Sequence, residues 1–338
     1  MKATIYEGNK TFTVIDKEIE QPSNREVRIK VAYSGVCGTD VHIYHGMMDK
    51  RVAMPQTIGH EMSGIIDAVG TGVTGFSVGE KVVVRPLDDR KVKASDKGFN
   101  HICEELKFIG IDSPGSMQQY WNVPAFVLHK LKAETDLKLA ALIEPLSVAT
   151  HDVRRSGLVK GETAVVLGGG PIGLLVAMVA KEVGAQVIIS EVNPKRIAKA
   201  KELGFDAVSP LELDLVEYVK SKTENRRADV VFEVAGVQPA LDVMCEVAGI
   251  RGRILMVAIH GEKKPVDLFK FFWKELSLIG ARVYEKEDYE KAIELITANE
   301  LPFEQMITDV QPLTNIQQVF ENIDNNPDGL KVLMDCQL

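Results

Sequence analysis

The feature that most constrains the fold of this chain is a glycine-rich run, GGGPIG, at positions 168–173. It directly follows Thr163–Leu167, an apolar run typical of a buried strand, and precedes an apolar segment of helical length. Gly168, Gly170 and Gly173 fit the pattern G-x-G-x-x-G. In this pattern the glycines allow a tight turn, close approach of the backbone to a pyrophosphate, and packing of the helix on the strand. The run therefore predicts a dinucleotide-binding unit, and the alternative is a glycine turn without a ligand.

Strand and helix patterns alternate from about residue 155 onwards. Strands are predicted at 163–168, 186–190, 206–208, 229–233, 253–257 and 276–280, and helices at 172–183, 194–203, 212–222, 238–247 and 267–274. Six strands with short crossovers predict a doubly wound parallel sheet. We expect this Rossmann domain to span residues 151–284.

The first 150 residues contain short apolar runs punctuated by glycine, which predict a β-rich domain. Glu26–Ala32 alternates with period two, and 65–69 and 81–84 are further predicted strands. The segment 285–338 contains a helix with one apolar face and a strand at 331–334. Because this segment is too small to bury its own core, we expect it to complete the β-rich domain.

Charge and cysteine content exclude several classes of protein. The chain has 338 residues with 40 Lys and Arg against 48 Asp and Glu, a net charge of −8. This acidic balance argues against sequence-independent nucleic-acid binding and against a polybasic membrane anchor. No apolar run has the roughly 18 residues of a membrane span, and Met1–Val14 contains no signal-peptide core. Four scattered cysteines without a C-x-x-C pair predict free thiols and a cytoplasmic protein.

Glu191 ends the strand that follows the glycine-rich run. A carboxylate there accepts hydrogen bonds from the adenosine ribose hydroxyls and repels a 2′-phosphate, which predicts NAD rather than NADP. Arg196 lies further along the next helix. It is predicted to cover the adenine, and the alternative is an exposed helix residue.

Cys37, His60 and Glu61 are flanked by glycines in the segments GVCGTDVH and GHE. A buried cysteine is usually part of a core, and a lone histidine is usually not a metal ligand. Together, however, the three side chains offer sulfur, nitrogen and oxygen donors to a borderline-soft ion such as Zn²⁺. Three protein ligands leave one position open for water or substrate, as in a catalytic zinc site.

The run G-H-E-x2-G-x5-G-x2-V at 59–73 resembles the signature of zinc-containing alcohol dehydrogenases, which are medium-chain dehydrogenase/reductases. CGTDVH at 37–42 and EPLSVA at 144–149 resemble the sorbitol (polyol) and threonine dehydrogenase branch, and the similarity covers essentially the whole chain. The resemblance implies a GroES-like catalytic domain over residues 1–150, completed by 285–338.

The resemblance also implies roles for individual residues. Cys37 and His60 hold the catalytic zinc, and the third ligand is either Glu61 or Glu144. Thr39 receives the substrate proton and His42 passes it to solvent. Backbone contacts to the cofactor fall on Ile172, Val257, Ala258 and Ile259. Arg282 lies near substrate and nicotinamide, or else forms an interface salt bridge.

Many relatives hold a second, structural zinc with four cysteines spaced C-x2-C-x2-C-x7-C. Counting back from Cys103 by this spacing gives Ser95, Val92 and Asp89. Only one of the four thiolates is present, so we expect one zinc per chain and no structural zinc.

These residues predict a zinc-dependent enzyme that transfers a hydride between a secondary alcohol and NAD, with the site in the cleft between the domains. The expected substrate is a polyol, a sugar acid or another sugar-derived compound. Alternatives are a threonine-type or vicinal-diol dehydrogenase, a zinc-free reductase and a non-catalytic NAD-binding protein. We also expect a homo-oligomer, either a dimer or a tetramer.

Overall fold

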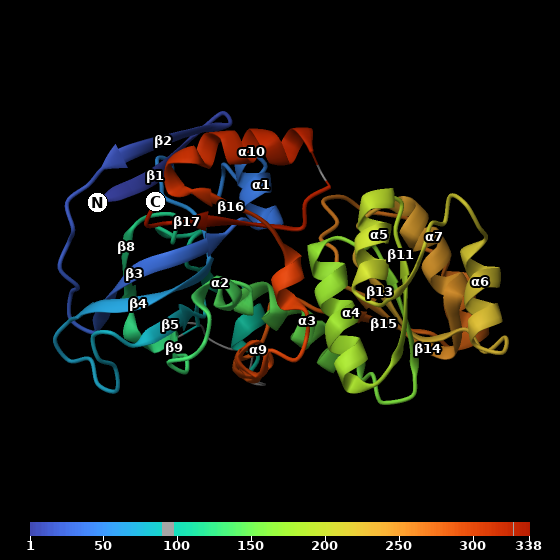
Figure 1. Cartoon of the computed structure of the whole chain (residues 1–338). Coiled ribbons are helices and arrows are strands. Elements are labelled where there is room, and N and C mark those ends of the chain that lie inside the picture. Colours follow the sequence, from blue (N-terminus) through green and yellow to red (C-terminus); the bar gives the residue numbers. More distant parts are fainter. Residues whose placement is uncertain (90–97, 327) are drawn as a thin grey trace. The chain divides into compact units, whose positions relative to one another are not determined.

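The computed structural model describes residues 1–89, 98–326 and 328–338, which form two compact units. One unit comprises Met1–Glu144 and Tyr289–Leu338, and the other comprises Pro145–Asp288. The chain passes from unit to unit inside helix α3 (Ile143–Ser156) and inside helix α9 (Lys286–Ala298) (Figure 1). In the described part of the chain, no helix has both the length and the apolar character needed to cross a membrane.

The second unit contains a six-stranded sheet with the order β12-β11-β10-β13-β14-β15, in which all neighbouring strands are parallel. The strands are β10 (Thr163–Leu167), β11 (Gln186–Ser190), β12 (Asp206–Val208), β13 (Ala228–Glu233), β14 (Ala248–Met256) and β15 (Ser277–Gly280). The helices are α4 (Pro171–Val183), α5 (Pro194–Glu202), α6 (Leu215–Lys222), α7 (Gln238–Val247) and α8 (Leu268–Lys274). The predicted doubly wound parallel sheet is confirmed.

Two predicted boundaries in this unit are wrong. Helix α6 begins at Leu215 instead of 212, because the Asp214 side chain accepts the backbone N–H groups of Val216 and Glu217 and so caps the helix there. Strand β14 begins at Ala248 instead of 253, and Ala248 pairs with Ala228 before a shift in register.

The strand order reverses between β10 and β13, which is the topological switch point where such sheets bind ligands. β10 is buried along its whole length and leads directly into the glycine-rich turn. Gly168 has a φ of +112°, a conformation that side-chain-bearing residues rarely adopt. A Cβ at Gly173 would lie 1.9 Å from the carbonyl oxygen of Gly168. Glycine is therefore required at both positions for α4 to start close to the strand.

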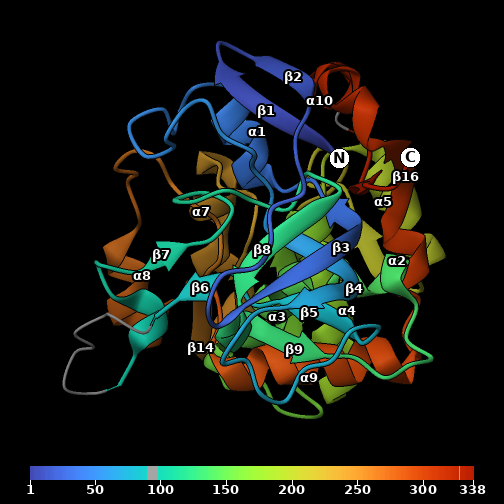
Figure 2. The same cartoon turned by 90° about the vertical axis from the view of Figure 1, so that its left-hand side faces the viewer.

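The first unit contains a seven-stranded sheet with the order β16-β17-β3-β4-β5-β9, in which β8 also pairs with β3 (Figure 2). Its strands are β3 (Glu26–Gly35), β4 (Glu61–Val69), β5 (Lys81–Val84), β8 (Tyr120–Pro124), β9 (Leu128–Lys130), β16 (Ile307–Pro312) and β17 (Lys331–Asp335). Two smaller sheets are formed by β1 (Lys2–Gly8) with β2 (Thr11–Asp16) and by β6 (Leu87–Asp88) with β7 (Lys107–Phe108). Its other α-helices are α1 (Gly38–Tyr44), α2 (Leu137–Ala140) and α10 (Ile316–Asn325).

The register of three strands in this sheet positions the candidate metal ligands. Gly35, at the end of β3, lies opposite Glu61 on β4 and opposite Leu333 on β17. Cys37 follows β3 directly, His60 directly precedes β4, and β17 begins at Lys331. The antiparallel pairing of β3 with both neighbours therefore brings three distant segments of the chain to one end of the sheet.

An ion-pair network around the buried side chains of His151 and Asp288 lies where the chain crosses between the units. The Asp288 carboxylate pairs with His151 Nδ1 at 2.7 Å and accepts a hydrogen bond from Arg154 Nε at 2.6 Å. Burial acts to raise the pKa of Asp288, but these hydrogen bonds lower it to about 2. His151, Glu285 and Asp288 lie close enough to hold an ion. The Arg154 guanidinium already bonds both acids, so we interpret this group as an ion-pair network.

Candidate metal centre and dinucleotide site

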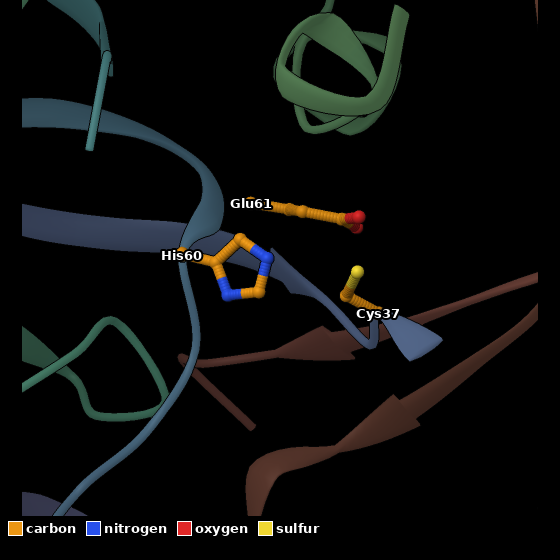
Figure 3. Close-up of side chains that lie close together, drawn as sticks. All are labelled: Cys37, His60 and Glu61. Atoms are coloured by element: carbon orange, nitrogen blue, oxygen red, sulfur yellow. The ribbon is translucent and has the colours of Figure 1, made fainter. Parts of the chain in front are cut away.

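Cys37, His60 and Glu61 converge, with one ligand atom from each lying within 4.8 Å of the others (Figure 3). His60 and Glu61 are buried, while Cys37 is half-buried at the start of α1. Figure 3 shows the Nε2 of His60 and the carboxylate of Glu61 turned towards the Cys37 side. The structure thus brings together three of the four metal ligands that the sequence predicts.

Asp40 lies behind the imidazole of His60 and was not predicted from the sequence. Its Oδ1 is 3.6 Å from His60 Nδ1, and its Oδ2 accepts the backbone N–H of Cys37 at 2.9 Å. Burial raises the pKa of Asp40 to about 6, although the neighbouring His60 charge acts to lower it. Burial acts to lower the pKa of His60, but Asp40 and Cys37 raise it well above its usual value. A carboxylate on the far nitrogen is the usual support of a metal-binding imidazole.

Glu61 forms a buried ion pair with Lys331, a second residue that sequence analysis missed. Lys331 Nζ lies 2.8 Å and 2.7 Å from the two carboxylate oxygens and 3.2 Å from the carbonyl oxygen of Val36. The side chains are 4 % and 0 % exposed. Burial acts to lower the pKa of Lys331, but the charges of Glu61 and Cys37 raise it. The ammonium group therefore stabilises the negative charge that burial would otherwise disfavour.

Glu144 is buried in the first turn of α3 and is not a member of the close group formed by Cys37, His60 and Glu61. Its negative charge nevertheless acts on both His60 and Lys331 by raising their pKa values. Both Glu61 and Glu144 therefore remain candidates for the third ligand.

Thr39 and His42 lie three residues apart on α1, and residues at this spacing share one face of a helix. Thr39 is half-buried and His42 is exposed to solvent. This gradation from interior to solvent is compatible with the predicted proton path.

The donor set itself tests whether this centre suits zinc. A thiol, an imidazole nitrogen and a carboxylate are the side chains that bind Zn²⁺. The Nδ1 of His60 and the Oδ1 of Asp40 are buried without hydrogen-bond partners among the described residues. A metal-binding imidazole donates its remaining N–H to such a carboxylate, so the orphaned atoms fit a metal-loaded centre.

The glycine-rich turn and Glu191 form a second site at the carboxyl ends of β10 and β11. Glu191 Oε2 accepts the backbone N–H of Gly169 at 2.7 Å, and Oε1 accepts those of Val192 and Asn193 at 2.7 Å and 2.9 Å. A Cβ on Gly170 would lie 3.5 Å from Arg196 Nη1, so this guanidinium lies close to the turn. The structure thus places Glu191 and Arg196 beside the glycine-rich turn, as the sequence predicts.

The other predicted cofactor contacts follow β14 and β15 on the same edge of the sheet. Val257 and Ala258 donate their N–H groups to the carbonyl oxygen of Glu233, each at 3.0 Å. Ile259 is 80 % exposed, and Arg282 is exposed beyond β15. In parallel sheets this edge is where ligands bind.

Comparison with known proteins defines the family. The zinc-binding dehydrogenase family model matches residues 171–298, and the alcohol dehydrogenase GroES-like domain matches residues 23–133. A 2-dehydro-3-deoxy-L-galactonate 5-dehydrogenase of Pseudoalteromonas atlantica is 56 % identical over 99 % of both chains. A sorbitol dehydrogenase of Halalkalibacterium halodurans is 34 % identical over 99 % of both chains. The crystal structure of galactitol-1-phosphate dehydrogenase from Escherichia coli is 27 % identical, with a TM-score of 0.92 over 99 % of this chain and 100 % of that one.

The chain belongs to the zinc-dependent medium-chain alcohol dehydrogenase family. It is an oxidoreductase of the alcohol and polyol dehydrogenase type, which confirms the predicted reaction class and the GroES-like and Rossmann folds. The zinc-free reductase and the non-catalytic NAD-binding protein are thereby disfavoured.

We predict that Cys37→Ser lowers the zinc content at least about tenfold after dialysis against zinc-free buffer, because a hydroxyl replaces the thiolate ligand. Elemental analysis measures this loss. Cys103→Ser is the matched control and should keep the wild-type content. Full zinc retention by Cys37→Ser would contradict the proposed centre.

We further predict that Lys331→Met destabilises the zinc-free protein by about 3 kcal/mol, because it leaves the Glu61 carboxylate buried and unpaired. Urea unfolding measures the change, and adding Glu61→Gln should recover part of it. Lys130→Met breaks the more exposed pair with Glu80 and should cost less than about 1 kcal/mol. Equal effects of the two lysine substitutions would refute this account.

Proposed function

We propose that this enzyme oxidises a secondary hydroxyl of a sugar-derived carboxylic acid, using NAD and a single zinc ion per chain. The relative that is 56 % identical over 99 % of both chains is named a 2-dehydro-3-deoxy-L-galactonate 5-dehydrogenase, and this similarity supports the substrate class. The convergence of Cys37, His60 and Glu61 carries the proposal, because this centre provides the Lewis acid that alcohol oxidation needs.

When bound, zinc lowers the pKa of the substrate hydroxyl, and NAD accepts the hydride. Cys37 and His60 would hold the ion, with Glu61 or Glu144 as the third ligand. Thr39 Oγ1 would accept the hydroxyl proton as it releases its own, and the imidazole of His42 would receive the released proton and pass it to solvent. Asp40 orients His60, and Lys331 fixes the Glu61 carboxylate.

The arrangement of Glu191 supports NAD over NADP. Its buried carboxylate is held beside the glycine-rich turn by three backbone N–H groups, so a 2′-phosphate would meet a fixed negative charge. The single zinc per chain is supported by the one cysteine among the four structural positions. Of the other three, Val92 and Ser95 lie outside the described residues, and Asp89 pairs with Arg85 at 3.3 Å.

A substrate panel tests the proposed function. With NAD, we expect kcat/KM for 2-dehydro-3-deoxy-L-galactonate to exceed those for sorbitol, butane-2,3-diol, galactitol 1-phosphate and L-threonine. For the best substrate it should fall at least about tenfold when NADP replaces NAD. Reduction of the dinucleotide is followed by absorbance. Preference for threonine or the diol would favour the corresponding alternative, and preference for NADP would refute the role of Glu191.

We also propose that the enzyme is a homo-oligomer that forms through the outer edge of β15 and the apolar face of α8. β15 ends the six-stranded sheet, and no strand among the described residues pairs with its outer side. On α8, which precedes β15 in the chain, Phe272 and Trp273 are 77 % and 69 % exposed. A second copy satisfies both features, because the same edge and face pair with themselves about a two-fold axis. The four scattered cysteines, which form no C-x-x-C pair in the sequence, support a cytoplasmic location.

Light scattering during size-exclusion chromatography tests this interface. We expect the wild type to elute as a dimer or tetramer, and Phe272→Glu to lower the assembled mass because it places a charge in an apolar contact. Leu211→Glu changes a leucine that is 78 % exposed elsewhere on the same unit and should leave the mass unchanged. A monomeric wild type, or an unchanged mass for Phe272→Glu, would refute the interface.

A further inference from the structure

A buried carboxylate joins two loops at the carboxyl edge of the parallel sheet. Glu233 is the last residue of β13 and is 0 % exposed. Its Oε1 accepts the backbone N–H of Gly236 at 2.8 Å, and its Oε2 lies 3.1 Å from Nε2 of His260. Gly236 belongs to the loop after β13, and His260 belongs to the loop after β14. One side chain therefore holds both loops.

The two loops also contact each other and the glycine-rich turn. A Cβ on Gly236 would lie 3.4 Å from the Cβ of Ala258, and a Cβ on Gly168 would lie 3.0 Å from the backbone nitrogen of Ala235. Val257 and Ala258 also donate backbone hydrogen bonds to the Glu233 carbonyl oxygen. Together these interactions form a continuous path of contacts. The path runs from the glycine-rich turn to the segment 257–259, across the switch point of the sheet.

Burial of the Glu233 carboxylate is unfavourable for the free energy of folding, so stability alone does not account for its contact with His260. A carboxylate without solvent needs compensating hydrogen bonds, and apolar side chains at both positions would avoid that need. The Nδ1 atom of His260 is buried and, within the described part of the chain, has no hydrogen-bond partner. Buried polar pairs with such unpaired atoms concentrate at functional sites. The location of Glu233 and His260 beside the switch point agrees with this expectation.

We propose that Glu233 and His260 are positioning residues of the dinucleotide site. Their contact fixes the backbone of 257–259 relative to the glycine-rich turn, so both segments are ordered before the dinucleotide binds. Neither side chain needs to touch the dinucleotide for this role. The inference rests on the proposed function, because it assumes that the dinucleotide binds at this edge.

A matched pair of amides tests the proposal in the full-length, zinc-loaded enzyme. The amide nitrogen of Gln reaches about as far as Nε2 of histidine, whereas that of Asn reaches only as far as Nδ1. His260→Gln should therefore keep the hydrogen bond to Glu233, and His260→Asn should lose it. We expect the Kd for NADH, measured by fluorescence titration, to rise about tenfold in His260→Asn and less than about threefold in His260→Gln. Zinc content should stay unchanged in both variants.

Combination with Glu233→Leu, which has no polar atom to pair with His260, distinguishes this contact from a general structural effect. If the pair acts as one unit, His260→Asn in the Glu233→Leu background should raise the Kd for NADH by less than about twofold beyond the value of Glu233→Leu alone. Glu162→Gln is the control, because it removes the charge of a carboxylate that accepts a hydrogen bond from Arg253 at 2.5 Å and belongs to the residue preceding β10, at the opposite edge of the sheet. This control should leave the Kd for NADH unchanged.

The outcomes separate this inference from the proposed function. Failure of the wild-type enzyme to bind NADH would refute the proposed function and this inference with it. Wild-type binding together with an unchanged Kd in His260→Asn would overturn the inference alone. Equal losses in His260→Asn and His260→Gln would also overturn it, because the hydrogen bond to Glu233 would then not be the cause. If His260→Asn does not fold, the Kd of Glu233→Leu decides, and an unchanged value overturns the inference.

Discussion

The pairing of β3 with β4 on one side and with β17 on the other is the constraint on which the metal centre depends. It joins Glu61 to Lys331, two residues 270 positions apart in the sequence, in a contact that solvent does not reach. A carboxylate placed there without the ammonium group would be strongly destabilised. The C-terminal strand therefore supplies the charge that lets an acidic metal-binding group exist inside the β-rich unit.

Local sequence patterns were sufficient to predict most of the parallel sheet, because each strand is a short apolar run that ends at a glycine or polar turn. The exception is β14. Its first half contains two glycines and the exposed residues Ile250 and Arg251, so no apolar run marks it. Pairing with β13 extends the strand there, and a contact of this kind between distant segments has no local signal.

The difference between local sequence patterns and contacts between distant segments also applies to the residues of the metal centre. Cys37, His60 and Glu61 could be identified because glycine-flanked motifs surround them, and the structure brings them together. Lys331 could not be identified, because a lysine at the start of a strand ordinarily faces solvent, and only strand pairing shows that it is buried. Asp40 carried a weak signal, since an acid three residues after a helix-capping position commonly bonds the backbone there.

Buried carboxylates with fixed partners are common to both sites. Glu61 is held by Lys331, Glu191 by backbone N–H groups, and Glu233 by Gly236 and His260. At least one partner of each acid, namely Lys331, Gly169 or His260, comes from a distant segment of the chain, so each acid is oriented by the fold rather than by the ligand. Groups ordered in advance lose little conformational entropy when a ligand binds. The free energy that these buried charges cost in folding thus lowers the cost of ordering the sites when metal and dinucleotide bind.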